Sequence, residues 1–276
     1  MQGEDLMSSY TLKNDFVLVE IDEYASEIHH FQSLATGLEY MWQGDPKYWQ
    51  GRNPTLFPMV GKTWQGYLLI KGQKYQMNNH GFARHSQFHC IQHDDHHLIM
   101  ELNDSEETWT QYPYHFNLQI DYQLVNKKLC INYAIKNKSL ELMPFHFGLH
   151  PAFNWPIDKN DNPDDYRLEL SHPEMVNGHL TTSLKLDREA LAKTIILTAP
   201  QSTYTKLSNG RHFVKVEHPH FPWLAFWSPH APFVCIEPWY SHTDFKANNL
   251  AFDKREGCIT LDIDETWKCS YSIEID

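Results

Sequence analysis

The strongest structural signal in this 276-residue chain is a run of alternating apolar and polar residues from Phe116 to Leu124. Side chains of an extended strand point alternately to its two faces, so the pattern predicts a strand with one buried face. A second alternating run, Leu129 to Ile135, follows after the short segment Val125–Lys127. Short connections join antiparallel neighbours, and the two runs are therefore expected to form a hairpin.

Short strand candidates recur on both sides of this hairpin, separated by glycine, proline and asparagine turn signals. A helical turn is expected only over Asp187–Lys193, and Asp158–Asp165 is expected to be a polar loop. Many short strands with hardly any helix favour an all-β fold, a large antiparallel β-sandwich. The expected strands are Phe16–Ile21, Glu27–Phe31, Tyr67–Ile70, Lys74–Met77, Gln87–Gln92, His97–Leu102, Thr108–Gln111, Tyr114–Leu124, Lys128–Lys136, Arg167–Leu170, Thr194–Leu197, Phe213–Val216, Trp223–Trp227, Thr260–Ile263 and Cys269–Ile275.

Residues 10–276 are expected to form a single domain, because all-β domains of this length are often undivided. Residues 1–9 are polar and unpatterned, so they are interpreted as a disordered or non-native extension, with Met7 as a possible natural start. No basic region followed by an apolar block opens the chain, and no apolar run approaches membrane-spanning length. A cytoplasmic protein is therefore expected.

The formal net charge of -12 argues against nucleic acid and against a membrane surface, since both attract basic faces. The five cysteines are scattered without a CxxC spacing, which indicates reduced thiols rather than a disulfide framework or a zinc site. Cys130 and Cys235 lie in apolar runs and are interpreted as small core residues. No cofactor and no metal is expected, and the chain is expected to be a monomer or a homodimer.

Two histidines, His146 and His150, share the segment Met143–Pro156 near the middle of the chain. In an extended segment they would lie on one face, with Gly148 leaving room between the two rings. Pro151 would end the strand directly after His150, because proline has no N–H to donate. His150 is thus expected at a strand end, where it could meet a ligand or simply pack.

A second unusual position is Glu237, which follows the apolar run Phe233–Ile236 and precedes Pro238. Acids are rarely buried unless they are paired or functional. Trp239 and Tyr240 offer flat apolar faces of the kind that stack on sugar rings. His150 and Glu237, both expected at strand ends, are therefore predicted to act together at a sugar site.

Three short motifs follow one another in order: His80–Arg84, His150–Phe153 and Cys235–Trp239. Glu39–Pro46 and Leu56–Gly61 add weaker support. With these motifs the chain resembles the aldose 1-epimerase (mutarotase) superfamily, and within it the LacX-like branch of small bacterial proteins. The similarity covers nearly the whole chain.

The resemblance implies a galactose mutarotase-like β-sandwich, or supersandwich, with the sugar in a cleft on one sheet. It implies His150 as the general acid and Glu237 as the general base, and it places His80 and Arg84 along the sugar. Further candidates for substrate contact are Arg52, His146 and Trp239. The chain departs from the usual family residues at His85, His146 and Leu149.

The implied activity is that of an isomerase that interconverts the α and β anomers of a hexose. A base removes the proton of the C1 hydroxyl, an acid protonates the ring oxygen, and the ring closes again on the other face. Each well-placed acid or base typically contributes roughly 10²–10⁴ in rate. The reaction requires no redox cofactor and no metal, and a neutral sugar is favoured as the substrate.

Alternatives remain open at this point. A non-catalytic carbohydrate-binding protein would share the sandwich and the aromatic residues without needing an acid–base pair. A hexose-6-phosphate 1-epimerase would need basic residues at the site, for which Arg52, Lys62 and Arg84 are available.

A metalloenzyme is a further alternative, because the chain contains 18 histidines. Asp94 and Asp95 interrupt the first histidine cluster, which favours a solvated turn, and no third ligand accompanies the second. The two clusters are His89, His93, His96 and His97, and His218 with His220.

Overall fold

The computed structural model describes residues 8–276, and within this range no helix is long and apolar enough to cross a membrane. The strands are β1 (Ser9–Lys13), β2 (Val17–Asp22), β3 (Ile28–Ser33), β4 (Thr55–Leu56), β5 (Tyr67–Ile70), β6 (Gln73–Gln76), β7 (His89–His93), β8 (His97–Asn103), β9 (Phe116–Val125), β10 (Lys128–Asn137), β11 (Met143–Phe145), β12 (Gly148–Leu149), β13 (Ala152–Asn154), β14 (Arg167–Val176), β15 (His179–Lys185), β16 (Ile195–Thr198), β17 (Tyr204–Ser208), β18 (Phe213–Glu217), β19 (Trp223–Trp227), β20 (Phe233–Trp239), β21 (Ile259–Leu261) and β22 (Thr266–Ile275). The helices are α1 (Glu106–Gln111) and α2 (Arg188–Ala192), with 3₁₀ turns at η1 (Ala83–His85), η2 (Pro163–Asp165) and η3 (Phe252–Lys254).

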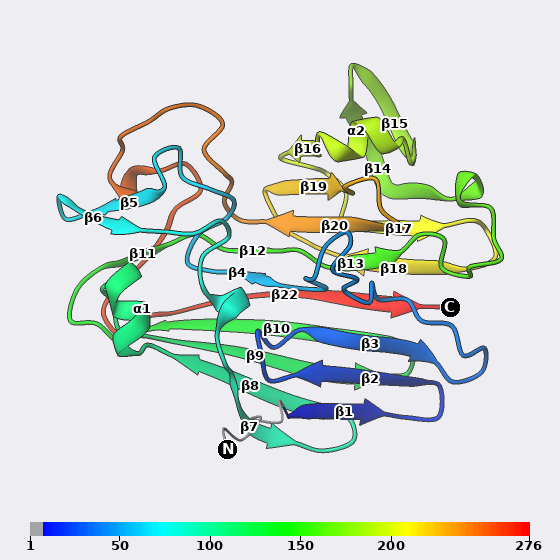
Figure 1. Ribbon diagram of the computed structural model, residues 1–276, viewed down its shortest axis with the longest axis horizontal. Helices are drawn as coiled ribbons and strands as arrows, with labels where there is room; N and C mark the ends of the chain where they lie inside the picture. Colours follow the sequence, from blue (N-terminus) through cyan, green and yellow to red (C-terminus); the bar gives the residue numbers. More distant parts are fainter. Residues whose placement is uncertain (1–7) are drawn as a thin grey trace.

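The predicted central hairpin is confirmed, and it lies within a nine-stranded antiparallel sheet. β9 and β10 pair in unbroken register from Phe116 opposite Asn137 to Val125 opposite Lys128. Along both strands buried and more accessible residues alternate, as the sequence pattern predicts. The sheet order is β15-β14-β17-β18-β22-β10-β9-β8-β7, so the last strand of the chain runs through its centre (Figure 1).

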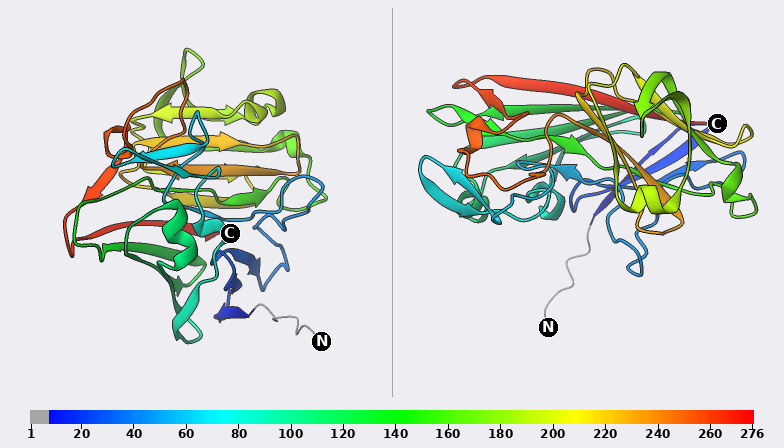
Figure 2. Two further views of the ribbon diagram at one scale, coloured as in Figure 1. Left: turned by 60° about the vertical axis from the view of Figure 1, so that its left-hand side comes forward. Right: turned by 90° about the horizontal axis from the view of Figure 1, so that it is seen from above.

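Two smaller sheets cover the apolar face of this large sheet. One is the three-stranded sheet β1-β2-β3, and the other has the order β16-β19-β20-β12-β4, with β13 also paired to β20. Figure 2 shows these layers from two further directions. One continuous apolar core joins them, in which Val19 of β2 and Leu149 of β12 belong to the same cluster as Ile120 of β9. The predicted all-β sandwich is therefore confirmed.

Two local predictions need correction. Thr108–Gln111 is expected to be a strand but belongs to helix α1, because Ser105 and Thr108 form a reciprocal capping box at the N-terminus of that helix. Ser9, expected in the N-terminal extension, opens strand β1, while residues 1–7 of that expected extension lie outside the described residues. The helical turn predicted over Asp187–Lys193 is confirmed as α2.

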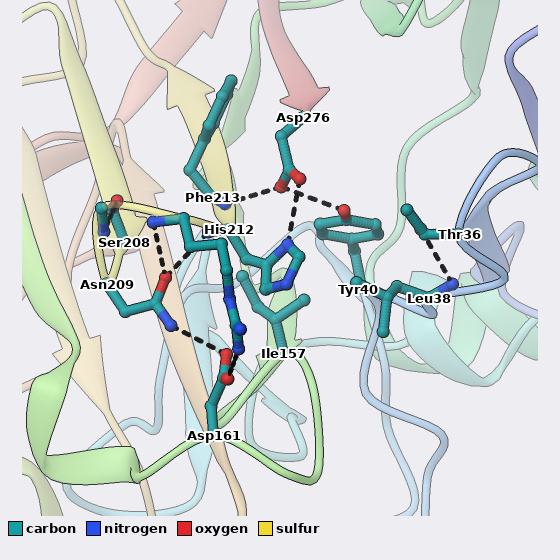
Figure 3. Close-up of polar contacts among 12 residues, drawn as sticks. Thr36, Leu38, Tyr40, Ile157, Asp161, Ser208, Asn209, His212, Phe213 and Asp276 are labelled. Carbon is teal, nitrogen blue, oxygen red and sulfur yellow. Dashed lines mark hydrogen bonds and ion pairs between the residues drawn. The ribbon is translucent and has the colours of Figure 1, made fainter.

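The carboxylate of Asp276 connects the start of β18 in the large sheet to the loop between β3 and β4 (Figure 3). Its Oδ1 accepts hydrogen bonds from the Tyr40 hydroxyl at 3.0 Å and the Phe213 backbone N–H at 2.7 Å, and His212 Nδ1 lies 3.1 Å from Oδ2. Tyr40 is buried and lies in the long loop that leads from β3 to β4. This contact anchors a loop that contributes to the candidate site.

Candidate active site

A cavity of about 540 Å³ opens over β20 and the end of β12, and five of the predicted site residues line it: His80, Arg84, His150, Glu237 and Trp239. A larger cavity, of about 630 Å³, lies beside Tyr24 and Gln111 and contains none of the predicted site residues. The smaller cavity, called the cleft below, is lined by Trp49, Gly61, Lys62, Asn79, His80, Arg84, His150, Thr194, Trp227, Glu237, Trp239 and Thr243.

His150 and Glu237 meet at the floor of the cleft, with His150 Nε2 3.2 Å from Glu237 Oε2. His150 directly follows β12, and Pro151 separates it from β13, so the predicted strand-end position is confirmed. Both side chains are almost entirely buried, at 7% and 2% exposure. Two neighbouring strands of one sheet thus hold the two groups in direct contact.

Glu237 does not lie at a strand end as expected, because β20 continues to Trp239. Proline is normally excluded from a central strand, since it cannot donate to the ladder. Ile236 N–H donates to Pro151 O at 3.1 Å, and beyond this bond the neighbouring ladder is interrupted between β13 and β12. Pro238 falls at this interruption, where a missing N–H is tolerated.

Burial shifts the two groups in opposite directions. Desolvation raises the pKa of Glu237 well above its usual value, opposed by the nearby Trp239 indole and the Arg84 charge. Desolvation lowers the pKa of His150 well below its usual value, and the neighbouring His80 and Arg84 lower it further. In the neutral pair, the Glu237 carboxyl group therefore holds the proton. Moving this proton to His150 would give a carboxylate and an imidazolium with the same total number of protons. One proton is available for exchange across the 3.2 Å contact.

His80 lies beside the pair, with its ring centroid 5.4 Å from that of His150. The Gly61 backbone N–H donates to His80 Nδ1 at 3.1 Å, so the ring carries its proton on Nε2. Burial, and after it the Arg84 charge, lowers the pKa of His80 to about 3. At neutral pH His80 is an uncharged hydrogen-bond donor through Nε2.

The backbone of the His80 loop depends on the glycine that follows. Gly81 has a φ of +72°, and a Cβ added there would lie 2.2 Å from the Phe57 carbonyl oxygen. That oxygen also accepts hydrogen bonds from the backbone N–H groups of Phe82 and Ala83, at 3.0 and 3.1 Å. Only glycine allows the loop to approach Phe57 this closely.

Arg84 lies in η1 and brings a guanidinium to the cleft. Burial lowers its pKa, while the carboxyl groups of Glu27 and Glu237 act in the opposite direction. Its buried Nε makes no hydrogen bond to the described part of the protein. The guanidinium therefore has donors to offer to a ligand.

Tryptophans enclose the His150 ring. Trp49 packs on it with a centroid distance of 4.7 Å and a tilt of 32° between the ring planes, and Trp227 meets it edge-on at 5.5 Å. The Trp42 indole N–H donates to the Trp49 carbonyl at 2.8 Å and so holds the loop that carries Trp49. The sequence alone assigns neither Trp49 nor Trp227 a role in the site.

A family model described as aldose 1-epimerase covers residues 8–274. The chain belongs to the aldose 1-epimerase family.

Relatives of this family support the same assignment. Protein LacX of Lactococcus lactis subsp. lactis is 28% identical, over 96% of this chain and 98% of its own length. A solved galactose mutarotase related enzyme from Lactobacillus acidophilus has a TM-score of 0.90 and 27% identity, over 98% of this chain and 97% of that chain. A galactose mutarotase-like protein from Lactobacillus casei has a TM-score of 0.90 and 26% identity, over 98% of this chain and all of that chain. The predicted resemblance is confirmed.

Two of the predicted substrate-contacting residues do not line the cleft. His146 is buried against Phe252, at a centroid distance of 5.2 Å, and neither ring nitrogen has a hydrogen-bond partner among the described residues. The Arg52 backbone N–H donates to Glu27 Oε1 at 3.0 Å, and its Nη1 lies 3.4 Å from His29 Nε2. Arg52 therefore stabilises the loop that carries Trp49.

Gly148 makes room for a different group than expected. A Cβ added to Gly148 would lie 2.8 Å from Trp239 Cδ1 and 3.0 Å from Val60 Cγ2. The glycine thus accommodates the Trp239 indole, which lines the cleft as predicted, rather than separating two histidine rings.

The surface histidine clusters do not form a metal site within residues 8–276. His97 Nε2 lies 2.9 Å from Asp121 Oδ1, and His93 Nε2 lies 3.0 Å from the Thr11 carbonyl oxygen. The buried His218 lies 2.9 Å from the Thr205 hydroxyl. The one group of metal-ligand side chains that converges in this range is His150, Cys235 and Glu237.

Proposed function

We propose that the protein is an aldose 1-epimerase that interconverts the α and β anomers of a hexose, with His150 as the general acid and Glu237 as the general base. The single observation that carries this proposal is the 3.2 Å contact between the two groups at the floor of an accessible cleft. The C1 hydroxyl and the ring oxygen of a cyclic sugar are bonded to the same carbon. An acid and a base that serve both atoms must therefore lie close together.

The proton balance of the pair fits the reaction. The proton of the pair first moves from Glu237 to His150 across their contact. The Glu237 carboxylate then takes the proton of the C1 hydroxyl, the bond from C1 to the ring oxygen breaks as the aldehyde forms, and protonated His150 gives its proton to the ring oxygen. The pair then consists of a carboxylic acid and a neutral imidazole, which is the state that burial favours. After rotation about the C1–C2 bond, the reverse transfers close the ring on the other face and restore the pair.

Neighbouring residues would bind and orient the sugar. His80 offers an N–H and Arg84 a planar set of donors, both suited to sugar oxygens. Trp239 and Trp49 present aromatic surface to the cleft, suited to the apolar face of a sugar ring. Such contacts hold the anomeric carbon against the acid and the base, which lowers the entropic part of the barrier.

Polarimetry on freshly dissolved α-D-glucose and α-D-galactose tests the proposal. Wild-type protein should accelerate the approach to anomeric equilibrium, and His150→Ala and Glu237→Gln should each lose roughly 10²–10⁴ of that acceleration. His96→Ala, at an exposed position outside the cleft, is the matched control and should retain it. Sugar binding without any acceleration by the wild type would favour the carbohydrate-binding alternative.

One observation favours a hexose 6-phosphate as a second candidate substrate. Lys62 and Arg84 both line the cleft, and neither forms an ion pair with a carboxylate within 4.0 Å in the part of the chain that the structure describes. A phosphate at the cleft entrance would gain charge-assisted hydrogen bonds from them. A Lys62→Gln substitution that weakens turnover of glucose 6-phosphate, and leaves that of glucose unchanged, would identify the phosphorylated substrate.

A further inference from the structure

The Cys235 thiol lies next to His150 and Glu237, and all three side chains carry atoms that can bind a metal ion. Cys235 and Glu237 are two positions apart on β20 and therefore project from the same face of the strand. Cys235 Sγ, a His150 ring nitrogen and a Glu237 carboxylate oxygen all lie within 4.8 Å of one another, and all three residues are buried. The proposed epimerase reaction has no use for the thiol.

The spacing of the three atoms suits a tetrahedral metal ion. Zinc binds nitrogen and oxygen ligands at about 2.0–2.2 Å and sulfur at about 2.3 Å, so tetrahedral ligand atoms lie roughly 3.3–3.7 Å apart. The distance between His150 Nε2 and Glu237 Oε2 is already 3.2 Å. The two separations that involve Cys235 Sγ are at most 4.8 Å. Side-chain adjustments alone would therefore bring the three atoms to the tetrahedral spacing.

The charges of the three groups also suit a divalent cation. Once deprotonated, the thiol and the carboxyl group together neutralise a charge of two, and a ring nitrogen of His150 supplies the third ligand. Metal sites with three protein ligands leave a fourth position open. Here that position would face the cleft, because two of the three ligands, His150 and Glu237, line it.

We propose that His150, Cys235 and Glu237 form a binding site for a thiophilic divalent cation such as Zn²⁺ or Cd²⁺, and that the bound ion blocks the acid–base pair. Binding displaces two protons, one from the Cys235 thiol and the one shared by His150 and Glu237. The ion then occupies the lone pairs that would exchange protons with the sugar. The binding site stands on geometry alone, whereas the block rests on the proposed epimerase function.

Titration with CdCl₂ tests the site without reference to activity, because a cadmium–thiolate bond gives a charge-transfer absorption band in the ultraviolet. The wild-type protein should develop this band with saturable binding, and Cys235→Ala should lose it. Cys130→Ala, at a partly buried position on β10, is the matched control and should retain the band and its affinity. An equal band in wild type and Cys235→Ala would overturn the proposal.

Glu237→Gln provides a second test that does not depend on the folding of Cys235→Ala. It keeps the thiol and the size of the carboxyl side chain but removes one anionic ligand. Loss of a direct ligand should weaken Cd²⁺ binding by more than the roughly 10–100-fold that loss of an outer-shell partner costs. An unchanged affinity would show that the ion binds the thiol outside this site.

The proposed inhibition by the bound ion is tested by polarimetry with and without ZnCl₂. Each protein is compared with its own metal-free rate. Zn²⁺ should abolish acceleration by the wild type, EDTA should restore it, and Cys235→Ala should need more than tenfold more Zn²⁺ for the same inhibition. Full activity at Zn²⁺ saturation would overturn the inhibitory half. If the wild type shows no epimerase activity at all, the cadmium band still decides the site, so the two proposals fail separately.

Discussion

Two histidines four positions apart in the chain, His146 and His150, occupy two different environments. Both are buried, and burial lowers the pKa of both. His150 faces a carboxyl group at 3.2 Å and borders the cleft. His146 packs on Phe252, does not line the cleft, and has no hydrogen-bond partner for its ring nitrogens among the described residues. Burial alone therefore does not identify a functional histidine, whereas a buried partner together with access does.

The difference arises from a change of sheet between the two residues. β11 pairs with β21, while β12 pairs with β20 and β4, so the chain leaves one ladder and enters another at residues 146–147. The His146 backbone N–H donates to the Pro58 carbonyl at 2.8 Å during this passage. Alternation of faces holds only within one strand, which is why the expected shared face does not form.

The largest expected effect comes from placing leucine at each histidine. His150→Leu removes the proposed acid and should lower kcat/KM for mutarotation by roughly 10²–10⁴. His146→Leu should change kcat/KM by less than about twofold, since removal of an unpaired buried polar group by an apolar residue is often tolerated. Steady-state polarimetry compares both variants, and a larger loss in His146→Leu would reverse the assignment of the two rings.

A second substitution acts on His80, a neighbour that His150 has and His146 lacks. Gly81→Ala should destabilise the fold and move His80, because the added Cβ would clash with the Phe57 carbonyl oxygen at 2.2 Å in a left-handed conformation. Gly178→Ala, with a φ of +82° and nothing within 4 Å, is the matched control for backbone strain alone.

Strain at a left-handed residue costs roughly 1–2 kcal/mol, so Gly178→Ala should lose about that much unfolding free energy in urea and keep its activity. Gly81→Ala should lose more and lower kcat/KM as well. Equal losses in the two variants, with activity retained, would show that the contact between Gly81 and Phe57 does not position the cleft.

The pH dependence of stability reports on the buried, neutral state of His146. Burial, followed by the Arg255 and His242 charges, lowers the pKa of His146 from 6.5 to about 3 in the folded protein. Below pH 6.5 the unfolded chain therefore binds a proton that the folded chain does not, and folding stability falls as the pH falls from 6.5 towards 3.

His146→Leu should remove this contribution, which amounts to at most about 1.4 kcal/mol for each pH unit. Urea unfolding should be measured at a series of pH values from 7 to 4. As the pH falls, the unfolding free energy of His146→Leu should rise relative to that of the wild type. Parallel curves would indicate that His146 is not neutral at low pH in the folded state.

The smallest expected effect concerns the aromatic cover of His150. An aromatic pair contributes about 0.5–1.5 kcal/mol beyond burial, so Trp49→Leu should reduce kcat/KM by roughly two- to tenfold. Trp109 stacks on His115 with a similar centroid distance, 4.6 Å against 4.7 Å, but lies away from the cleft. Trp109→Leu is therefore the matched control, and an equal reduction in both variants would mean that the stacking on His150 has no particular role.

The sequence predicts the large sheet well, because alternation along β9 and β10 depends only on local burial. It also predicts the contact between His150 and Glu237, since proline follows each residue and the family resemblance joins them. Trp49 and Trp227 reach the cleft through long-range packing, for which the local sequence carries no signal. The position of Arg52 outside the cleft could not be predicted, for a related reason. An arginine in a loop looks the same in the sequence whether it contacts a substrate or, as here, holds its own loop in place through a hydrogen bond to Glu27.

Exchange NMR on an equilibrium mixture of α- and β-D-glucose is the most direct test of the acid–base pair, because it detects interconversion without any net reaction. Wild-type protein and His146→Leu should both transfer saturation between the two anomeric protons. His150→Leu and Glu237→Gln should not transfer it above the rate in buffer. Transfer that survives loss of either member of the pair, or that disappears in His146→Leu while His150→Leu retains it, would contradict the role of His150 and Glu237 as the acid and base.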